Sequence, residues 1–231
     1  MKLTWLGHSG FRVEIADQVL LIDPWLTGNP MFEGQDRAAA IAGATAILIT
    51  HAHFDHAGEA VALSRETGAP LVGIFDLMEY WETTEKVKTV KFHKGGTVEL
   101  GSVAVTLVNA VHSSTLDGPD GFKVAGSEAG FMIAGEGHTI YVSGDTDVTA
   151  DMGIFEALHQ PDIGILCVGG HFTMDQRRAA YAAKTFFNFK TIVPCHYKTF
   201  PMLAQDVEEL KAALPEIEIL ELEVMRPHDI A

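Results

Sequence analysis

Three histidines and one aspartate fall within six residues of this chain, in the segment His51-Ala52-His53-Phe54-Asp55-His56. The apolar run Ala46–Ile49 that precedes the segment has the length of a buried strand. The residues that follow it, Ala57–Thr67, are expected to form a helix that ends before Gly68. A strand-to-helix junction lies at the carboxyl edge of a sheet, where α/β proteins present side chains to ligands.

The spacing within this segment suits metal binding. Residues two apart in an extended chain point to the same side, so His51 and His53 can hold one ion together. Asp55 and His56 lie where the chain turns into the helix and can face a second ion. Neutral imidazole and carboxylate groups are ligands for zinc and similar divalent transition ions. A single histidine is more often structural than a ligand, but four such residues at one junction predict a metal site.

Further ligands are expected from other strands. His112, Asp145 and His196 each follow an apolar run at its carboxyl end, and these runs are Val103–Val111, Thr139–Ser143 and Thr191–Cys195. A turn or helix cap would explain any one of the three, Asp145 above all. Their shared placement at the edge that also bears His51 favours a common metal site.

The rest of the chain predicts sheets flanked by helices. The other short apolar runs that fit strands are Leu3–Leu6, Phe11–Ile15, Val19–Ile22, Leu71–Phe75, Thr89–Phe92, Thr97–Leu100, Phe131–Ala134, Ile163–Val168 and Ile217–Leu222. Further helices are expected over Leu77–Trp81, Asp175–Phe187 and Met202–Leu214, the last with its apolar residues on one face.

Two long segments without periodicity, Pro24–Gly43 and Ser113–Gly130, are expected to be loops, and such loops are usually functional or disordered. The first loop carries four large apolar residues, Trp25, Leu26, Met31 and Phe32. They fit two roles. They can form a lid that contacts a substrate, or they can pack at the interface of a homo-oligomer.

At this point the chain resembles the metallo-β-lactamase superfamily, because His51 to His56 match its H-x-H-x-D-H signature. The resemblance implies one α+β domain over residues 1–231, a four-layer αββα sandwich of two mixed β-sheets flanked by helices. It also implies two ions. The implied ligands are His51, His53 and His112 for the first ion, Asp55, His56 and His196 for the second, and Asp145 as the bridge between them.

Three shorter segments are similar to one cytoplasmic branch of this superfamily, the small metal-dependent hydrolases related to L-ascorbate-6-phosphate lactonase. They are Gly7–Phe11, Gly169–Met174 and His196–Pro201. Two residues depart from the usual pattern of the branch: His171 stands where Asn or Asp is expected, and Lys198 where Gly is expected.

The expected chemistry is hydrolysis. Two divalent ions that share a water lower its pKa toward 7, and the bridging hydroxide can attack a carbonyl carbon or a phosphorus. Ester, lactone, amide and phosphodiester bonds are therefore candidates. Zinc is the first choice of metal, with manganese, iron or nickel as alternatives.

Asp55, His8 and His171 are the expected catalytic residues. His8 and His171 could each donate a proton to a leaving group or bind a substrate oxygen, although His8 is also explained as a polar turn residue. Tyr197, which follows His196, fits two roles: it can polarise a carbonyl oxygen of a substrate, or it can pack in the core. Cys195, which precedes His196, is expected to be buried rather than to act as a thiolate ligand.

Composition narrows the choice of partner. The chain has 16 Lys and Arg against 31 Asp and Glu, a formal charge of −15, which opposes binding to nucleic acid. A nuclease-type phosphodiesterase of the same fold is therefore the weaker enzyme alternative, and a non-catalytic metal-binding or sensor protein stays open. We expect a small or medium-sized substrate, and an anionic one is compatible with the positive charge of the ions.

The chain is expected to lie in the cytoplasm. No apolar stretch approaches the roughly 18 residues of a membrane span, and His8, Arg12 and Glu14 interrupt any secretory h-region. The two cysteines, Cys167 and Cys195, lie in apolar runs and do not suggest a disulfide framework.

Overall fold

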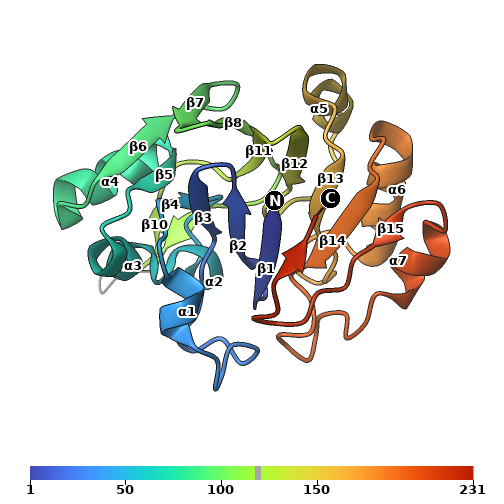
Figure 1. The fold of residues 1–231 in the computed structure, drawn as a ribbon, viewed down its shortest axis with the longest axis horizontal. Helices are drawn as coiled ribbons and strands as arrows, with labels where there is room; N and C mark the ends of the chain where they lie inside the picture. Colours follow the sequence, from blue (N-terminus) through green and yellow to red (C-terminus); the bar gives the residue numbers. More distant parts are fainter. Residues whose placement is uncertain (118–120, 231) are drawn as a thin grey trace.

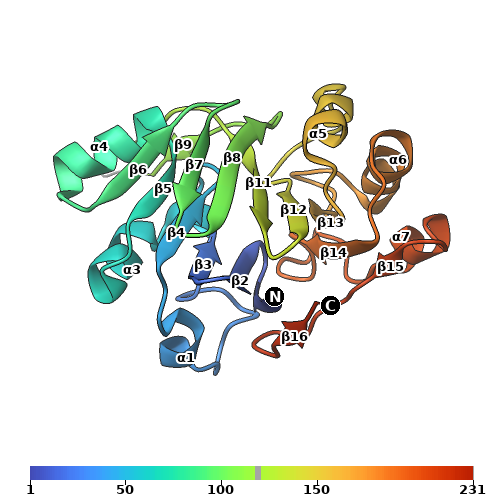
Figure 2. The ribbon, with the colours of Figure 1, turned by 45° about the horizontal axis from the view of Figure 1, so that its top comes forward.

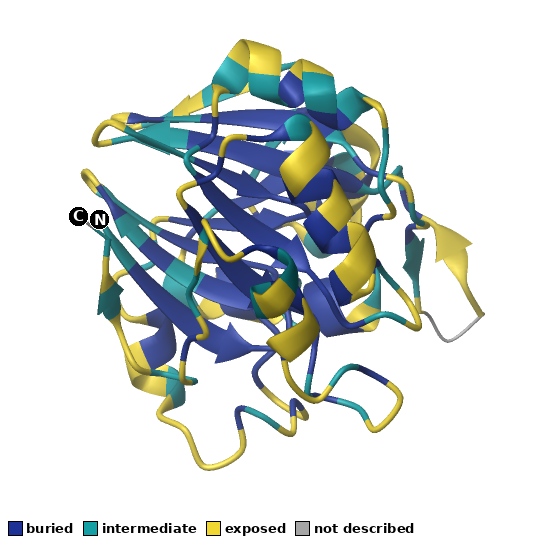
Figure 3. Cartoon of the chain, turned by 90° about the vertical axis from the view of Figure 1, so that its right-hand side faces the viewer, coloured by how far each residue is buried: buried dark blue, intermediate teal, exposed yellow. Residues whose placement is uncertain are grey.

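The computed structural model describes residues 1–117 and 121–230. Within them, two mixed seven-stranded sheets stack face to face, with helices on the outer faces (Figures 1 and 3). Both sheets contribute side chains to one continuous apolar core, in which Phe11 of the first sheet and Phe131 of the second have no exposed surface. The predicted αββα sandwich is therefore confirmed.

The first sheet is formed by strands from residues 2–92 and by one C-terminal strand. Its order is β16-β1-β2-β3-β4-β5-β6, and β3 to β6 run parallel. The strands are β1 (Lys2–Gly7), β2 (Gly10–Ile15), β3 (Gln18–Ile22), β4 (Ala46–Ile49), β5 (Leu71–Ile74), β6 (Thr89–Phe92) and β16 (His228–Asp229). Since β16 pairs with β1, the two ends of the described chain lie side by side (Figure 2).

The second sheet has the order β15-β14-β13-β12-β11-β8-β7, and β12 to β15 run parallel. Its strands are β7 (Thr97–Leu100), β8 (Val103–Asn109), β11 (Ala129–Gly135), β12 (His138–Val142), β13 (Ile163–Cys167), β14 (Thr191–Cys195) and β15 (Glu218–Ile219). A small separate hairpin pairs β9 (Thr115–Leu116) with β10 (Lys123–Val124).

The helices of the two halves lie on opposite sides of the sandwich (Figure 1). On the side of the first sheet they are α1 (Arg37–Ile41), α2 (Phe54–Ala57), α3 (Ala60–Thr67) and α4 (Phe75–Glu85). On the side of the second sheet they are α5 (Asp151–His159), α6 (Gln176–Phe186) and α7 (Glu208–Ala213). In the described part of the chain, no helix is both long and apolar enough to cross a bilayer.

The helices depart from the sequence prediction at identifiable residues. The helix expected over Ala57–Thr67 begins later, as α3 at Ala60, because the chain turns at Gly58 and Glu59, and Ala57 instead ends the preceding helix α2. The helix expected over Leu77–Trp81 extends to Phe75–Glu85. Helices α1 and α5 form in segments where none was predicted.

The helix expected over Met202–Leu214 is wrong in its first half, since only Glu208–Ala213 is helical. The apolar stripe is nevertheless buried, Leu203 and Val207 included. The backbone of this half bonds to other elements instead. Ala204 N–H donates to Gly169 O, and the Gln176 side chain donates to Asp206 O.

Candidate metal centre

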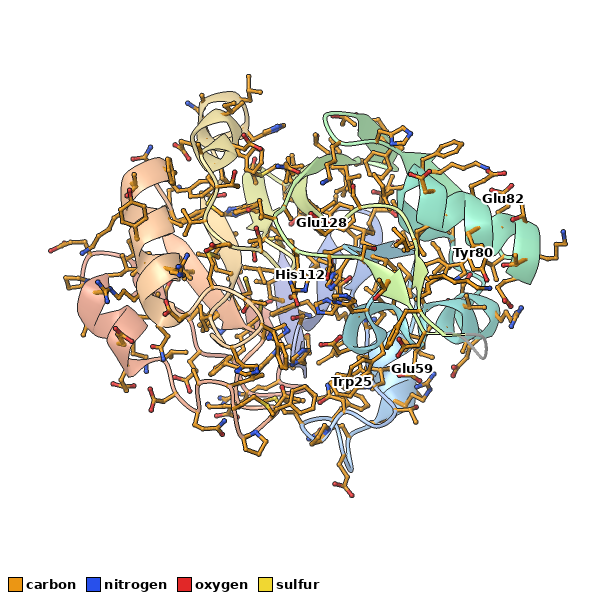
Figure 4. The ribbon with its side chains drawn as sticks, turned by 180° about the vertical axis from the view of Figure 1, so that it is seen from behind. Trp25, Glu59, Tyr80, Glu82, His112 and Glu128 are labelled. Atoms are coloured by element: carbon orange, nitrogen blue, oxygen red, sulfur yellow. The ribbon has the colours of Figure 1, made fainter. Side chains whose placement is uncertain are left out.

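The carboxyl ends of strands from both sheets meet in one place, and the predicted ligands converge there. His51 and His53 follow β4 of the first sheet, whereas His112, Asp145 and His196 follow β8, β12 and β14 of the second. Figure 4 shows His112 near the middle of the molecule, where the two halves meet.

Three histidines form the first group. His51, His53 and His112 each place one ring nitrogen within 4.8 Å of the others, and His51 Nε2 lies 3.0 Å from His53 Nδ1. The backbone N–H of His112 donates to Glu128 Oε1, which fixes the start of that loop (Figure 4). Three imidazoles around one point leave a fourth position open, as in catalytic zinc sites.

The second group contains Asp55, His56 and His196, with His8 beside them. The Nε2 atoms of His56 and His196 each lie 3.8 Å from Asp55 Oδ2. All four residues are buried, and the group combines nitrogen and oxygen donors.

The Asp145 carboxylate lies between the two groups. Its Oδ2 is 3.1 Å from His196 Nε2 and 3.6 Å from His112 Nε2, and its Oδ1 is 3.3 Å from His56 Nε2. One carboxylate thus faces ring nitrogens of both groups, which is the position that the resemblance implied for a bridging ligand.

These residues fit a divalent cation. Buried polar atoms almost always have a hydrogen-bond partner, yet His56 Nε2 and Asp145 Oδ1 have none among the described residues. Both atoms point into a cluster of imidazole and carboxylate groups. This is the donor set that zinc and related transition ions take.

Burial favours the neutral form of the three histidines in the first group, which is the form that can bind a metal. Burial is the main cause that lowers the pKa of His51 well below its usual value, and the nearby His56 lowers it further. Burial also lowers the pKa of His53 and of His112, against the opposing charges of Asp55 and Asp145.

The second group favours positive charge. Burial opposes a charge on His56, but Asp145, Asp23 and Asp55 outweigh it and raise the pKa of His56 well above its usual value. Burial likewise opposes charge on Asp145, and His196 and His56 more than compensate, so that its pKa falls well below the usual range. The carboxylates thus stabilise a cation here, whether a proton on His56 or a divalent ion.

Asp23 supports the site and was missed by the sequence analysis. It follows β3, which lies beside β4, so it stands at the same sheet edge as His51. Its Oδ1 accepts the Thr50 N–H at 2.8 Å, and its Oδ2 lies 2.7 Å from His56 Nδ1. Such a carboxylate fixes the tautomer and orientation of a ligating histidine. The signal was available, since Asp23 directly follows the predicted strand Val19–Ile22.

Replacing this carboxylate is expected to weaken metal binding. Asp23→Asn should lower the affinity for zinc by roughly 10- to 100-fold, because an outer partner of a ligating histidine is lost. The measurement is competition with a chromophoric chelator.

Asp162→Asn is the matched control. Asp162 also accepts a backbone N–H, from Thr139, and bonds a histidine, His138, but away from the cluster. Equal zinc affinity in the two variants would refute the role of Asp23.

His8 lies behind Asp55 and is completely buried. Its Nε2 is 2.9 Å from Asp55 Oδ2, and its Nδ1 is 2.8 Å from Thr199 Oγ1. Burial, followed by the charge of His196, lowers the pKa of His8 to about 4. A neutral ring that donates from Nε2 to Asp55 and accepts the Thr199 hydroxyl at Nδ1 satisfies both contacts. In this position His8 can orient the Asp55 carboxylate, and it is not among the described residues that line the cavity, where contact with a substrate was expected.

Three residues of the centre have a left-handed backbone. The φ angles are 53° for His8, 43° for Asp23 and 58° for His196. Non-glycine residues rarely adopt this conformation, and when they do they cluster at functional sites. The backbone is therefore bent at the points where these side chains must turn into the cluster.

His171 is not brought into the cluster. It is exposed, its ring packs edge-on against Phe172, and it lines a separate hollow of about 230 Å³. The backbone of Gly169 approaches the centre instead, since a Cβ there would lie 1.9 Å from His196 O. The expected contact of His171 with a substrate therefore has no support in its position.

Both residues that flank His196 pack in the core, which was the expectation for Cys195 and one of the two roles considered for Tyr197. The Tyr197 ring has no exposed surface and stacks on Trp5 at 5.3 Å, while Cys195 is buried as a free thiol. Neither belongs to a group that could hold a metal among the described residues.

A cavity of about 580 Å³ opens over the metal centre. His53, Asp55, His112, Asp145 and His196 line its floor. None of the four apolar residues expected as a lid or an interface lines it. Trp25, Leu26 and Phe32 are buried and Met31 is partly buried.

Comparisons with known proteins agree with this architecture. A family model described as a beta-lactamase superfamily domain matches residues 2–196. A UPF0173 metal-dependent hydrolase of Dinoroseobacter shibae is 67% identical over 225 residues, which cover 97% of this chain and 98% of that protein. One from Paracoccus denitrificans is 61% identical over 227 residues, or 98% of this chain and 99% of that protein.

A solved structure is also similar over the whole chain. It is Igni18, described as a novel metallo hydrolase from the hyperthermophilic archaeon Ignicoccus hospitalis. It superposes with a TM-score of 0.85 at 31% identity and covers 100% of this chain and 99% of its own.

Proposed function

The chain belongs to the metallo-β-lactamase superfamily and is a metal-dependent hydrolase, and from this premise we propose that it uses two divalent ions to cleave an ester, lactone or phosphodiester bond in a small or medium-sized molecule. The observation that carries the proposal is the position of Asp145 between two groups of ligands. Zinc is the proposed metal, and manganese, iron or nickel would suit the same donors.

The proposed ligands fall into two sets with one residue shared between them. His51, His53 and His112 would hold one ion, Asp55, His56 and His196 the other, and Asp145 both. When bound, the ions supply Lewis-acid polarisation of the scissile bond and a water of lowered pKa. Asp55 lines the cavity and keeps its negative charge, because His56 and the bond from His8 Nε2 lower its pKa despite burial.

The reaction adds one water across the bond. For an ester, the water oxygen bonds to the acyl carbon as the bond from that carbon to the alkoxy oxygen breaks. One proton of the water goes to the departing alkoxide, and the other is released to solvent. No described Ser or Cys side chain is needed as nucleophile, and Cys167 and Cys195 are both buried.

We also propose a cytoplasmic location and a small-molecule rather than nucleic-acid substrate. Cys167 and Cys195 are register neighbours on β13 and β14 and are free thiols, which suits a reducing compartment. The charge of −15 disfavours a polyanionic partner.

Metal counting tests the proposal. The zinc-loaded chain should contain two ions, His112→Ala and His196→Ala should each contain about one, and His171→Ala, the control, should retain two. The loaded chain should hydrolyse at least one of a set of ester, lactone and phosphodiester probes. A single ion in the unaltered chain would refute the dinuclear assignment, and two ions without turnover on any probe would favour a metal sensor.

A further inference from the structure

The walls of the cavity over the metal centre are strongly apolar. Four of the exposed large apolar side chains described in the structure lie here, with exposed fractions of 79% for Phe122, 54% for Met202, 53% for Phe54 and 49% for Phe172. Phe200 completes this wall. Exposed apolar groups that gather at one place mark a binding surface for an apolar partner.

These five residues, the apolar wall, come from the start of α2 and from three irregular segments, one of which carries both Phe200 and Met202. Two of them are supported from behind. Phe54 and Phe200 both pack on the Trp25 ring, at centroid distances of 5.5 and 6.0 Å. Glu59 anchors the Trp25 loop, because its carboxylate accepts the N–H groups of Leu26 and Thr27, both at 2.6 Å (Figure 4). The loop that was expected to form either a lid or an oligomer interface thus holds two wall residues in place.

The described lining of the cavity includes acidic side chains but no Lys or Arg. The sequence has no basic residue at 118–120 either. Asp55 and Asp145 face the metal centre. Asp117 is the acidic residue of the lining outside that centre, and the described residues offer it no salt-bridge partner.

We propose that the part of the substrate remote from the scissile bond is a bulky apolar group, and that Asp117, in the lining of the same cavity, rejects a negative charge on that group and accepts a positive one. Any negative charge on the substrate would lie at the metal ions, as the phosphoryl oxygen of a phosphodiester would. This inference rests on the proposed hydrolase function and specifies its substrate class.

The test uses the zinc-loaded chain and p-nitrophenyl esters with matched acyl groups. The acids are acetic, hexanoic, 6-aminohexanoic and adipic acid, the last as its monoester. Burial of the longer tail should make kcat/KM for the hexanoyl ester about tenfold or more higher than for the acetyl ester. The carboxylate-ended ester should fall about tenfold below the hexanoyl ester, and the ammonium-ended ester should exceed the carboxylate-ended one.

Two variants assign these effects to residues. Asp117→Asn should raise kcat/KM for the carboxylate-ended ester severalfold relative to the hexanoyl ester, whereas Glu99→Gln, at an exposed position on β7, removes the same charge and should not. Phe172→Ala should reduce the hexanoyl advantage severalfold, whereas Tyr181→Ala, on the exposed face of α6 outside the cavity, should leave it unchanged.

Binding of hydroxamates with the same four tails, measured by calorimetry, tests the inference without turnover, and the same order of affinities is expected. If no ester, lactone or phosphodiester probe is hydrolysed, the proposed function fails, but the order of hydroxamate affinities still decides the tail preference. Hydrolysis or binding that ignores the tail, or prefers the carboxylate end, would overturn the inference and leave the hydrolase function intact.

Discussion

Asp145→Ala should lower kcat/KM by about 10³-fold and reduce the zinc content of the purified chain. Loss of an outer partner of a metal ligand costs roughly 10- to 100-fold, and Asp145 contacts both ligand groups directly, so its loss should cost more. Steady-state kinetics on any ester that the unaltered chain hydrolyses, together with metal analysis, provides the measurement. Asp145→Asn keeps the shape of the side chain and tests the same charge if the alanine variant fails to fold.

The control for this variant is Asp147→Ala. Asp147 lies two residues further along the chain, is exposed, and pairs only with Arg178 among the described residues. It should retain both ions and nearly full activity. If Asp145→Ala kept the metal content and kcat/KM of the Asp147→Ala variant, Asp145 could not be the bridging ligand.

Removal of the metal should both abolish hydrolysis and lower the thermal midpoint by roughly 5–15 °C. A ligand that binds only the native state stabilises it by about 3–4 kcal/mol when present at 100 to 1,000 times its Kd. For a chain of this size, each kcal/mol corresponds to roughly 2–4 °C. Chelation also leaves buried carboxylates and imidazoles crowded together without the cation that their charges favour.

The measurement is thermal melting by circular dichroism with and without chelator, followed by addition of zinc. The midpoint and the activity should return together. The Asp145→Asn variant provides the comparison, since the same chelator should shift its midpoint less. A midpoint of the unaltered chain that is indifferent to chelation would show that the cluster holds no ion.

The sequence predicted that the candidate ligands converge, because each of them follows a strand. His112, Asp145 and His196 are far apart along the chain, but the parallel arrangement brings the carboxyl ends of β8, β12 and β14 to one edge. Asp23 obeys the same rule and was missed, since the Ile22-Asp23-Pro24 segment also has the composition of an ordinary turn.

The cavity wall could not be predicted in the same way. Phe122, Phe172 and Phe200 lie in irregular segments, where side-chain direction follows from tertiary contacts rather than from a repeat. The segment before α7 shows the same limit. Its apolar residues recur with helical spacing and are buried, yet its backbone groups bond to other elements.

Because the candidate ligands come from both sheets, a bound ion would connect the two halves of the chain. The chain crosses once from the first sheet to the second at residues 93–96, and only β16 returns. His51 to His56 lie before this crossing, and His112, Asp145 and His196 lie after it. A divalent ion shared by them, as proposed, would be a cross-link between two pieces that neither piece can form alone. A chain split at residues 93–96 would therefore regain its site only on reassembly, with metal uptake as the sign that the fragments had docked.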